Sequence, residues 1–93
     1  MPTGHYACEL PGEPTGPAAR RITEQDFRVT GASSYQADGA TGSYLLTGTS
    51  FVMTSGPRNG DRYLRQSEGF LRKIGPDGTP SLLRCIKRNP NND

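Results

Sequence analysis

Short runs of apolar and polar residues alternate along this chain, and glycine-containing turns separate them at regular intervals. Five glycines, at steps of nine, twelve, nine and nine residues, each close a turn-forming pair: Asp38-Gly39, Thr47-Gly48, Asn59-Gly60, Glu68-Gly69 and Asp77-Gly78. Glycine tolerates the positive φ that tight hairpin turns require. Regular turns with short extended runs between them predict an antiparallel meander.

Eight segments between or before these turns have the length and composition of short strands. They are residues 5–10, 27–30, 34–37, 42–46, 51–54, 62–65, 70–74 and 82–86. Residues 23–26 resemble a helix start, but Val29 and Thr30 soon favour extended chain, so any helix there has one turn. The pattern predicts an all-β fold: an antiparallel meander of about seven to eight strands, closed into a small barrel or curled sandwich.

Alternation within each segment predicts which side chains face the core. Tyr6, Cys8 and Leu10 share one face of the first strand, and Leu83 and Cys85 share one face of the last. In 70–74 the alternation is imperfect, because Arg72 lies on the face of the two apolar residues at its ends. The expected core consists of Tyr6, Phe27, Val29, Tyr35, Tyr44, Leu46, Phe51, Met53, Phe70, Leu83 and Ile86.

The chain has the length of one domain, residues 1–93, and a modest apolar content. Residues 11–21 are rich in proline and glycine and predict a surface loop, because proline cannot donate to a strand ladder. Residues 89–93 predict a polar, mobile tail. Only 31% of the residues are hydrophobic, so a domain of this size needs a further source of stability.

The two cysteines, Cys8 and Cys85, lie near opposite ends of the chain. A bridge between them would close a loop of 78 residues, counting both ends, and would stabilise the fold by about 4–5 kcal/mol. It would also tie the first strand to the last. The alternative is a pair of reduced, buried thiols that pack as small hydrophobes. We favour the bridge, because an even cysteine count in a small, loop-rich chain is typical of a disulfide framework.

A disulfide implies an oxidising compartment, so we expect a periplasmic or secreted protein. The first residues lack the basic start and apolar run of a signal peptide, which predicts that an export signal has been removed. A cytoplasmic protein with two free thiols is the alternative. No stretch of the sequence has the length of a transmembrane segment.

Charge is unevenly distributed along the sequence. Residues 1–57 hold three arginines and five acids, a balance of −2, whereas residues 58–93 hold eight basic residues and four acids, a balance of +4. One interpretation is a basic patch for an anionic partner. The other is that these charges solvate strand faces and protect sheet edges.

The residue pattern gives little support for catalysis, a cofactor or a metal, and we expect a protein that is not an enzyme. His5 is the only histidine, and a set of Ser55, His5 and Asp61 lacks the Gly-x-Ser-x-Gly turn that would expose a nucleophile. One histidine and two distant cysteines do not fill a zinc site. Residues 56–60 contain two glycines but lack the lysine and helix of a phosphate loop.

Residues 53–63 form the most distinctive connection between two predicted strands. The segment contains Pro57, two glycines and two arginines. Proline stiffens such a loop, so a projecting, cationic tip could enter a partner's cleft at a low entropic cost. The alternative is an ordinary long hairpin connection with Asn59-Gly60 at its turn.

Several of these residues resemble a known family, the periplasmic and lipid-anchored bacterial inhibitors of c-type lysozyme. Tyr6-Ala-Cys8 and Leu83-Arg-Cys85 resemble its early Tyr-x-Cys strand and late cysteine. Ser55-Gly56 with Arg62-Tyr63 resembles its Ser-Gly-x-Arg/Lys-Tyr loop, and Phe70-Leu-Arg-Lys73 its aromatic residue followed by lysine. The resemblance implies a small barrel closed by a disulfide, with Ser55 and Lys73 reaching the catalytic carboxylates of a lysozyme.

We therefore expect a small binding module, possible partners of which are a secreted lysozyme-like enzyme or an anionic envelope polymer. In the leading hypothesis the chain inhibits a lysozyme-type enzyme, and its contact residues are Ser55, Arg58, Arg62, Tyr63 and Lys73. The second hypothesis is an envelope-associated β domain whose basic face binds an anionic glycan, lipid or polymer. A third, less favoured, is a single-stranded nucleic-acid-binding barrel in which Tyr63 and Phe70 stack on bases.

Overall fold

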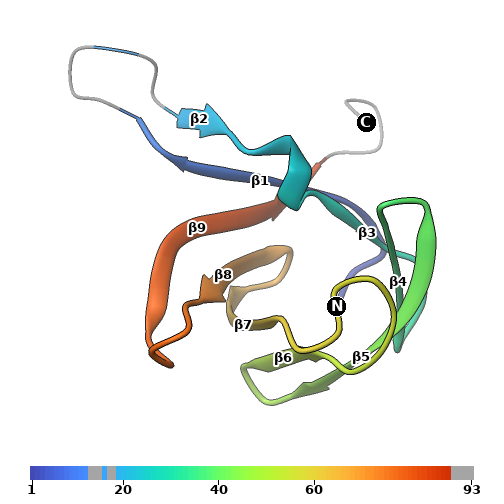
Figure 1. The fold of residues 1–93 in the computed structure, drawn as a ribbon. Coiled ribbons are helices and arrows are strands. Elements are labelled where there is room, and N and C mark those ends of the chain that lie inside the picture. Colours follow the sequence, from blue (N-terminus) through green and yellow to red (C-terminus); the bar gives the residue numbers. More distant parts are fainter. Residues whose placement is uncertain (13–15, 17–18, 89–93) are drawn as a thin grey trace.

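A computed structural model of the chain describes residues 1–12, 16 and 19–88 (Figure 1). Within these residues the chain forms nine strands and a single 3-10 turn, η1, and no α-helix. The elements are β1 (Gly4–Pro11), β2 (Ala19–Arg21), η1 (Thr23–Gln25), β3 (Phe27–Val29), β4 (Ser34–Ala37), β5 (Ala40–Thr47), β6 (Ser50–Met53), β7 (Arg62–Ser67), β8 (Phe70–Ile74) and β9 (Pro80–Lys87).

Eight of these strands close into an antiparallel barrel. Each strand from β3 to β9 pairs with the next in sequence, and β1 pairs with both β3 and β9, which closes the sheet (Figure 1). This topology confirms the prediction of a small all-β meander closed into a barrel. Closure also removes the long unpaired edges that an open sheet of this size would expose.

β2 is the ninth strand and lies outside the barrel. The first part of β1 pairs with β3, and its last part, Glu9 to Pro11, pairs with β2, so β1 and β2 extend from the barrel as a two-stranded arm (Figure 1). The predicted loop at 11–21 is therefore too long at both ends, since Pro11 ends β1 and a strand begins at Ala19. Its residues 13–15 and 17–18, and the predicted tail at 89–93, lie outside the described residues.

A disulfide joins the two strands that close the barrel, as predicted. Cys8 on β1 and Cys85 on β9 are directly opposite each other, with Cα atoms 4.0 Å apart, and both are fully buried. The covalent bond therefore lies at the seam where the first barrel strand meets the last. It holds together two segments that are far apart in the sequence and are otherwise joined by strand pairing and by the Glu9–Arg84 ion pair.

Aromatic rings fill most of the barrel interior, and they stack or meet edge to face. Eight of the eleven predicted core residues are buried, and Leu46 packs against them. The exceptions are Phe70 and Ile86, which lie half-exposed on the outer face. The core residues that the prediction omitted are Ala7, Cys8, Ala37, Tyr63, Leu71 and Cys85.

The prediction for β8 assigned the wrong face to the core. Leu71 is fully buried opposite Cys85, whereas Phe70 and Arg72 lie on the outer face with Ile74. The observed face directs Lys73 inward at the barrel rim, where its ammonium group contacts Gln25 and Asp61. An inward Phe70 would instead place Arg72 in the interior, and burying an unpaired cation costs far more than leaving a ring half-exposed.

The tyrosines of the core also fix the ends of the barrel. Three of the four donate their hydroxyl hydrogen to a backbone carbonyl outside their own strand: Tyr6 to Pro2 at 2.8 Å, Tyr35 to Ser55 at 2.7 Å and Tyr44 to Gly31 at 2.8 Å. A tyrosine-rich interior is stable because these polar atoms are satisfied where the rings reach the barrel ends. No helix in the described part of the chain is long and apolar enough to cross a membrane.

Candidate functional site

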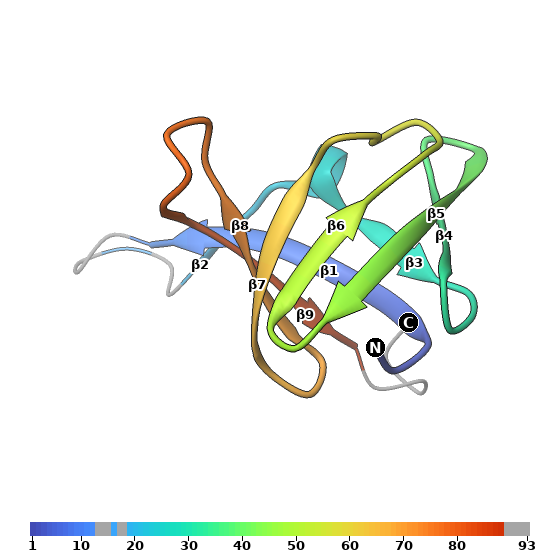
Figure 2. The ribbon, with the colours of Figure 1, turned by 90° about the horizontal axis from the view of Figure 1, so that it is seen from below.

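One end of the barrel carries the loop at 54–61, which belongs to the segment at 53–63 that the sequence singled out. In Figure 2, η1, the β4–β5 turn, the loop at 54–61 and the loop at 75–79 lie together at this end, which we call the loop end. The β5–β6 and β7–β8 turns lie at the opposite end. Antiparallel pairing of β7 with β8 brings Lys73 to the loop end as well, because Lys73, near the end of β8, pairs with Tyr63 near the start of β7.

The loop at 54–61 lies against the barrel end, which favours the ordinary hairpin connection over a projecting tip, the two interpretations that the sequence allows. Its Ser55 carbonyl accepts the Tyr35 hydroxyl, and the Ser55 Oγ accepts the backbone N–H of Ser43 at 3.1 Å. Later in the loop, the N–H of Gly60 donates to the Met53 carbonyl at 2.8 Å. The loop therefore lies across the barrel end, and Ser55 is held against β5 although its residue surface is exposed.

Two glycines allow this loop to approach β5 closely. A Cβ on Gly56 would lie 2.5 Å from the Cα of Gly42, and φ of Gly56 is +90°. A Cβ on Gly42 would overlap the Ser55 carbonyl oxygen and lie 2.6 Å from the Tyr35 ring. Backbone contact of this kind is possible only where side chains are absent from both segments.

Arg58 fixes the middle of the loop and is not available to a partner, which corrects its predicted role. Its guanidinium donates to the Asp38 carboxylate at 2.9 Å. It also donates to the carbonyls of Gln25, Glu24 and Asp26 in and beside η1, at 3.0, 2.8 and 3.1 Å. Only 9% of the side chain is exposed. Arg58 thus joins three segments of the loop end with the five donors of one planar group.

In this arrangement, which we call the Arg58 clamp, Arg58 and Asp38 each stabilise the ionised form of the other. The hydrogen bond from Arg58, together with its positive charge, lowers the pKa of Asp38 below its ordinary value. Burial alone would lower the pKa of Arg58, but the hydrogen bond and charge of Asp38 outweigh burial and raise it. Both groups therefore stay ionised over the physiological range of pH.

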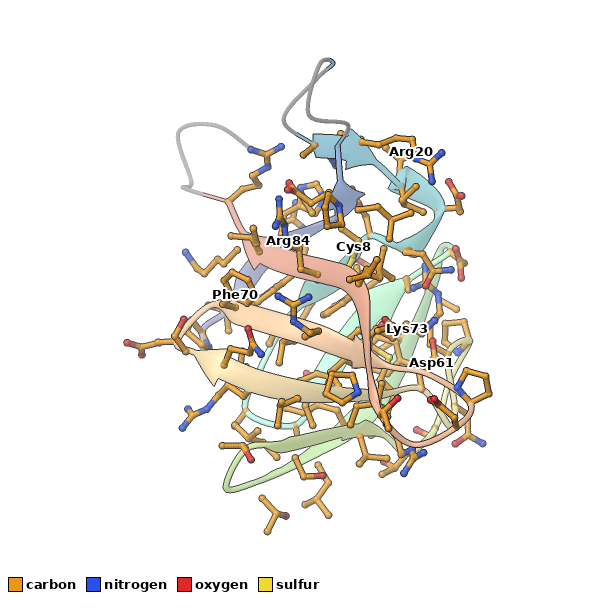
Figure 3. All side chains as sticks on the ribbon, turned by 90° about the vertical axis from the view of Figure 1, so that its left-hand side faces the viewer. Cys8, Arg20, Asp61, Phe70, Lys73 and Arg84 are labelled. Carbon is orange, nitrogen blue, oxygen red and sulfur yellow. A yellow bond between two sulfur atoms is a disulfide. The ribbon has the colours of Figure 1, made fainter. Side chains whose placement is uncertain are left out.

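Lys73 lies at the rim of the same barrel end with two polar neighbours. Its ammonium group donates to the Gln25 side-chain oxygen at 2.9 Å and lies 3.5 Å from the Asp61 carboxylate. A quarter of the side chain, 25%, is exposed. Figure 3 shows Lys73 and Asp61 side by side at this end. Lys73 thus lies beside the loop at 54–61, through Asp61 and not through Ser55.

An open surface pocket of about 290 Å³ connects Lys73 with Arg62. It is lined by residues 60–62 on one side and 73–76 on the other. Arg62 is exposed, and no carboxylate of the described residues contacts it. Of the five predicted contact residues, the structure therefore brings together Arg62 and Lys73.

Tyr63 is fully buried, so it cannot contact a partner as predicted. Its ring packs against Phe27 and Phe51, and burial raises the pKa of its hydroxyl. Among the described residues, its hydroxyl has no hydrogen-bond partner. Because base stacking on Tyr63 is excluded, the nucleic-acid hypothesis retains only the half-exposed Phe70 of its two rings.

Asp26 is a structural centre that sequence reasoning missed. Its carboxylate accepts the backbone N–H of Cys8 at 2.8 Å and lies 2.9 Å from Arg21 and 3.1 Å from His5. The sequence indicated only an acid near a helix start. The contacts of Cys8 and His5 come from β1, 18 and 21 residues away, and no local pattern encodes them. Within the described ranges, no cluster of three or more histidine, cysteine, aspartate or glutamate residues gathers to hold a metal.

Ion pairs within the chain neutralise part of the basic C-terminal region. Arg58, Lys73 and Arg84 each contact a carboxylate, from Asp38, Asp61 and Glu9 respectively. In the described part of the chain, Arg62, Arg65, Arg72 and Lys87 contact none. The surplus charge therefore lies on β7, β8 and β9.

No family model, curated protein or solved structure matches this chain. Any function must therefore be inferred from the geometry of the barrel and its side chains. At the loop end, that geometry consists of two cations, Arg62 and Lys73, around one open pocket on a rigid scaffold.

Proposed function

We propose that this protein is a non-catalytic binding module whose loop end blocks a carboxylate-lined cleft in an enzyme, with a c-type lysozyme as the first candidate. The observation that supports this proposal is the pocket shared by Arg62 and Lys73. Two cationic side chains from different strands border one opening at the end of a closed barrel. Such a pair suits a partner that presents two or more carboxylates.

Lys73 can bind a carboxylate of a partner while its side chain stays oriented by Gln25. Asp61 lies 3.5 Å from the ammonium group, beyond good hydrogen-bond distance, whereas Gln25 accepts at 2.9 Å. A partner carboxylate could therefore take one of the three lysine donors while Gln25 keeps the side chain oriented. Arg62 adds a planar fork that binds carboxylates in a bidentate manner.

The loop end is pre-organised for binding. The Arg58 clamp joins the loop to η1 and to the β4–β5 turn, and the buried disulfide closes the barrel beneath it. Because these groups are already ordered, association loses little conformational entropy. A standard interface buries about 800 Å² on each partner, so contact must extend beyond the pocket to the neighbouring loop at 75–79.

The disulfide also supports a location outside the cytoplasm. Structural disulfides form and persist in oxidising compartments, and a small domain with a modest core gains most from one. We place the protein, in this proposal, in a periplasm or outside the cell. A lysozyme-type partner acts in the same surroundings.

Inhibition of a c-type lysozyme during cell-wall lysis tests the proposal. The purified, oxidised protein should inhibit in a saturable manner, and Lys73→Ala should weaken inhibition by about tenfold or more, because a charge-assisted contact is lost. Lys87→Ala provides the matched control, since it removes the same group at the opposite end of the barrel, and it should leave inhibition within about twofold. Full lysozyme activity in a large molar excess of the protein would refute the proposed partner.

A further inference from the structure

A second surface lies on the outer face of β8 and β9 and meets the pocket at the loop end only at Ile74. Its members alternate with Leu71 and Lys73 on β8 and with the buried Leu83 and Cys85 on β9, and Figure 3 shows this face toward the viewer, with Phe70 and Arg84 labelled. We call it the outer strip. It consists of Phe70, Arg72 and Ile74 on β8 and of Leu82, Arg84 and Ile86 on β9.

Two arginines lie side by side at the centre of the outer strip. Arg72 and Arg84 are direct cross-strand partners, so their side chains leave the sheet about 5 Å apart on the same face. Like charges that lie directly opposite each other destabilise a sheet unless anions compensate them. The pair is therefore an arrangement that folding alone does not favour.

Only one of the two arginines is compensated by a carboxylate of the described residues. Arg84 donates from Nε and Nη2 to one oxygen of Glu9, at 2.9 and 2.6 Å. Among the described residues, Arg72 donates only to the Ser81 carbonyl, at 3.3 Å. The guanidinium of Arg72 therefore keeps most of its donors for an external anion, beside a second cation that raises the local potential.

Apolar side chains flank this arginine pair on both sides along the strands. On one side, Phe70 and Ile86 are cross-strand partners and both are half-exposed. On the other side, a register shift between Arg72 and Ile74 pairs Ile74 with Pro80. Ile74 is half-exposed, and Leu82 on β9 is 67% exposed, the most exposed large apolar side chain among the described residues. Along β8 the outer strip thus has three bands, apolar, cationic and apolar.

The spacing of the bands matches that of an extended peptide. Residues 70, 72 and 74 lie two apart on one strand, which places successive bands about 6.7 Å from one another. Side chains on one face of an extended chain repeat at the same distance, because every second residue faces the same way. A globular anion or a uniform polyanion does not combine charge with apolar groups at that interval.

We propose that the outer strip binds an extended segment of a protein partner in which an acidic residue lies between two apolar residues at alternate positions. The carboxylate binds Arg72 beside Arg84, and the apolar side chains cover Phe70 with Ile86 on one side and Ile74 with Leu82 on the other. The arginine pair lies outside the pocket at the loop end, and only Ile74 belongs to both surfaces, so the inference does not depend on the proposed inhibition of an enzyme.

A pair of synthetic peptides tests the inference with the intact, oxidised protein. In the first peptide, Leu, Glu and Leu occupy alternate positions and Thr fills the others; in the second, Gln replaces Glu. Titration followed by nuclear magnetic resonance should shift the methyl signals of Leu82, Ile74 and Ile86. Binding of the first peptide should exceed that of the second by about tenfold, the effect of one charge-assisted contact.

Matched variants separate this site from a general charge effect. Arg72→Gln should reduce affinity for the Glu peptide to that of the Gln peptide, whereas Arg20→Gln, an equal charge loss on the exposed strand β2, should leave it within about twofold. Three results would overturn the inference: no methyl shifts at millimolar peptide, shifts confined to the loop end, or equal losses in both variants. Equal losses would indicate a nonspecific response to polyanions.

Discussion

Cys8 and Cys85 lie directly opposite each other on β1 and β9, the two strands whose pairing closes the barrel. Four residue pairs join these strands, and the disulfide is the covalent part of that seam. Between the two cysteines the chain passes through all the remaining strands of the barrel. The bond therefore restrains the unfolded chain over nearly its whole length and holds the seam in the folded state.

Replacement of both cysteines by alanine should lower the free energy of unfolding by about 4 kcal/mol. The reason is that the disulfide closes a long loop and so reduces the entropy of the unfolded chain. Guanidinium denaturation of the oxidised protein and of the double variant measures the difference. A loss below about 1 kcal/mol would show that strand pairing alone holds the seam.

Much of the fold follows from local sequence features. Turn glycines and short alternating runs predicted eight strands, and all eight have counterparts in the barrel. The ninth, β2, was missed because residues 19–21 have neither alternation nor turn signals and pair only with the end of β1. The face of β8 was wrong because a half-exposed Phe70 and a buried Leu71 look alike in an apolar run, and only the position of Arg72 distinguishes them.

The candidate site was less predictable. Lys73 and Arg62 were identified from their charge and from motif resemblance, but their shared pocket depends on the pairing of β7 with β8. Arg58 looked like an exposed loop cation, yet it donates to carbonyls more than thirty residues away in sequence. Long-range contacts of this kind leave no local pattern, so a sequence cannot distinguish a clamp from a contact residue.

Gly42→Ala should be strongly destabilising, by about 3 kcal/mol, because the added Cβ would overlap the Ser55 carbonyl and displace the loop at 54–61. Gly48→Ala is the control. Its φ is +60° but no atom lies within 4 Å of the added Cβ, so only backbone strain of about 1 kcal/mol applies. Thermal unfolding of both variants measures which of the two loses more stability. Equal losses would contradict close packing of the loop on β5.

Arg58→Ala should cost about 2–3 kcal/mol, because it removes charge-assisted hydrogen bonds and leaves the carbonyls of Gln25 and Glu24 without their donors. Arg58→Lys should recover little, since one ammonium group cannot reach the positions of a planar fork. Arg62→Ala, an equal charge change at an exposed position, should alter stability by less than about 0.5 kcal/mol. Denaturant titration of the three variants tests this order, and full stability of Arg58→Lys would argue for simple charge attraction.

Two tyrosines at the loop end should respond in opposite ways to loss of their hydroxyl. The Tyr35 hydroxyl donates to Ser55 and accepts the N–H of Arg58 at 2.9 Å, so Tyr35→Phe should cost about 1–3 kcal/mol. The Tyr63 hydroxyl is buried without a partner among the described residues, so Tyr63→Phe should be neutral or stabilising by up to about 1 kcal/mol. Unfolding free energies of the two variants decide the matter, and a substantial loss in Tyr63→Phe would mean that its hydroxyl has a partner in solution.

Stability should fall at alkaline pH because folding raises tyrosine pKa values. Burial is the main cause for both Tyr6 and Tyr63, and nearby groups, Tyr44 for Tyr6 and Asp61 for Tyr63, add to it. An unfolded tyrosine loses its proton near its ordinary pKa of about 10, whereas the folded residue keeps it to higher pH. Above that value the native state binds more protons than the unfolded state, so the free energy of unfolding decreases as pH rises and is unaffected below it.

Tyrosinate absorbance and circular dichroism, recorded together during an alkaline titration, measure this effect. The absorbance of Tyr6 and Tyr63 as tyrosinates should appear together with unfolding. Tyr63→Phe should make the stability loss above a pH of about 10 less steep, because one of the groups that titrate on unfolding is removed. Complete tyrosine titration near the ordinary pKa, in a protein that keeps its β-sheet spectrum, would contradict the burial of these rings in solution.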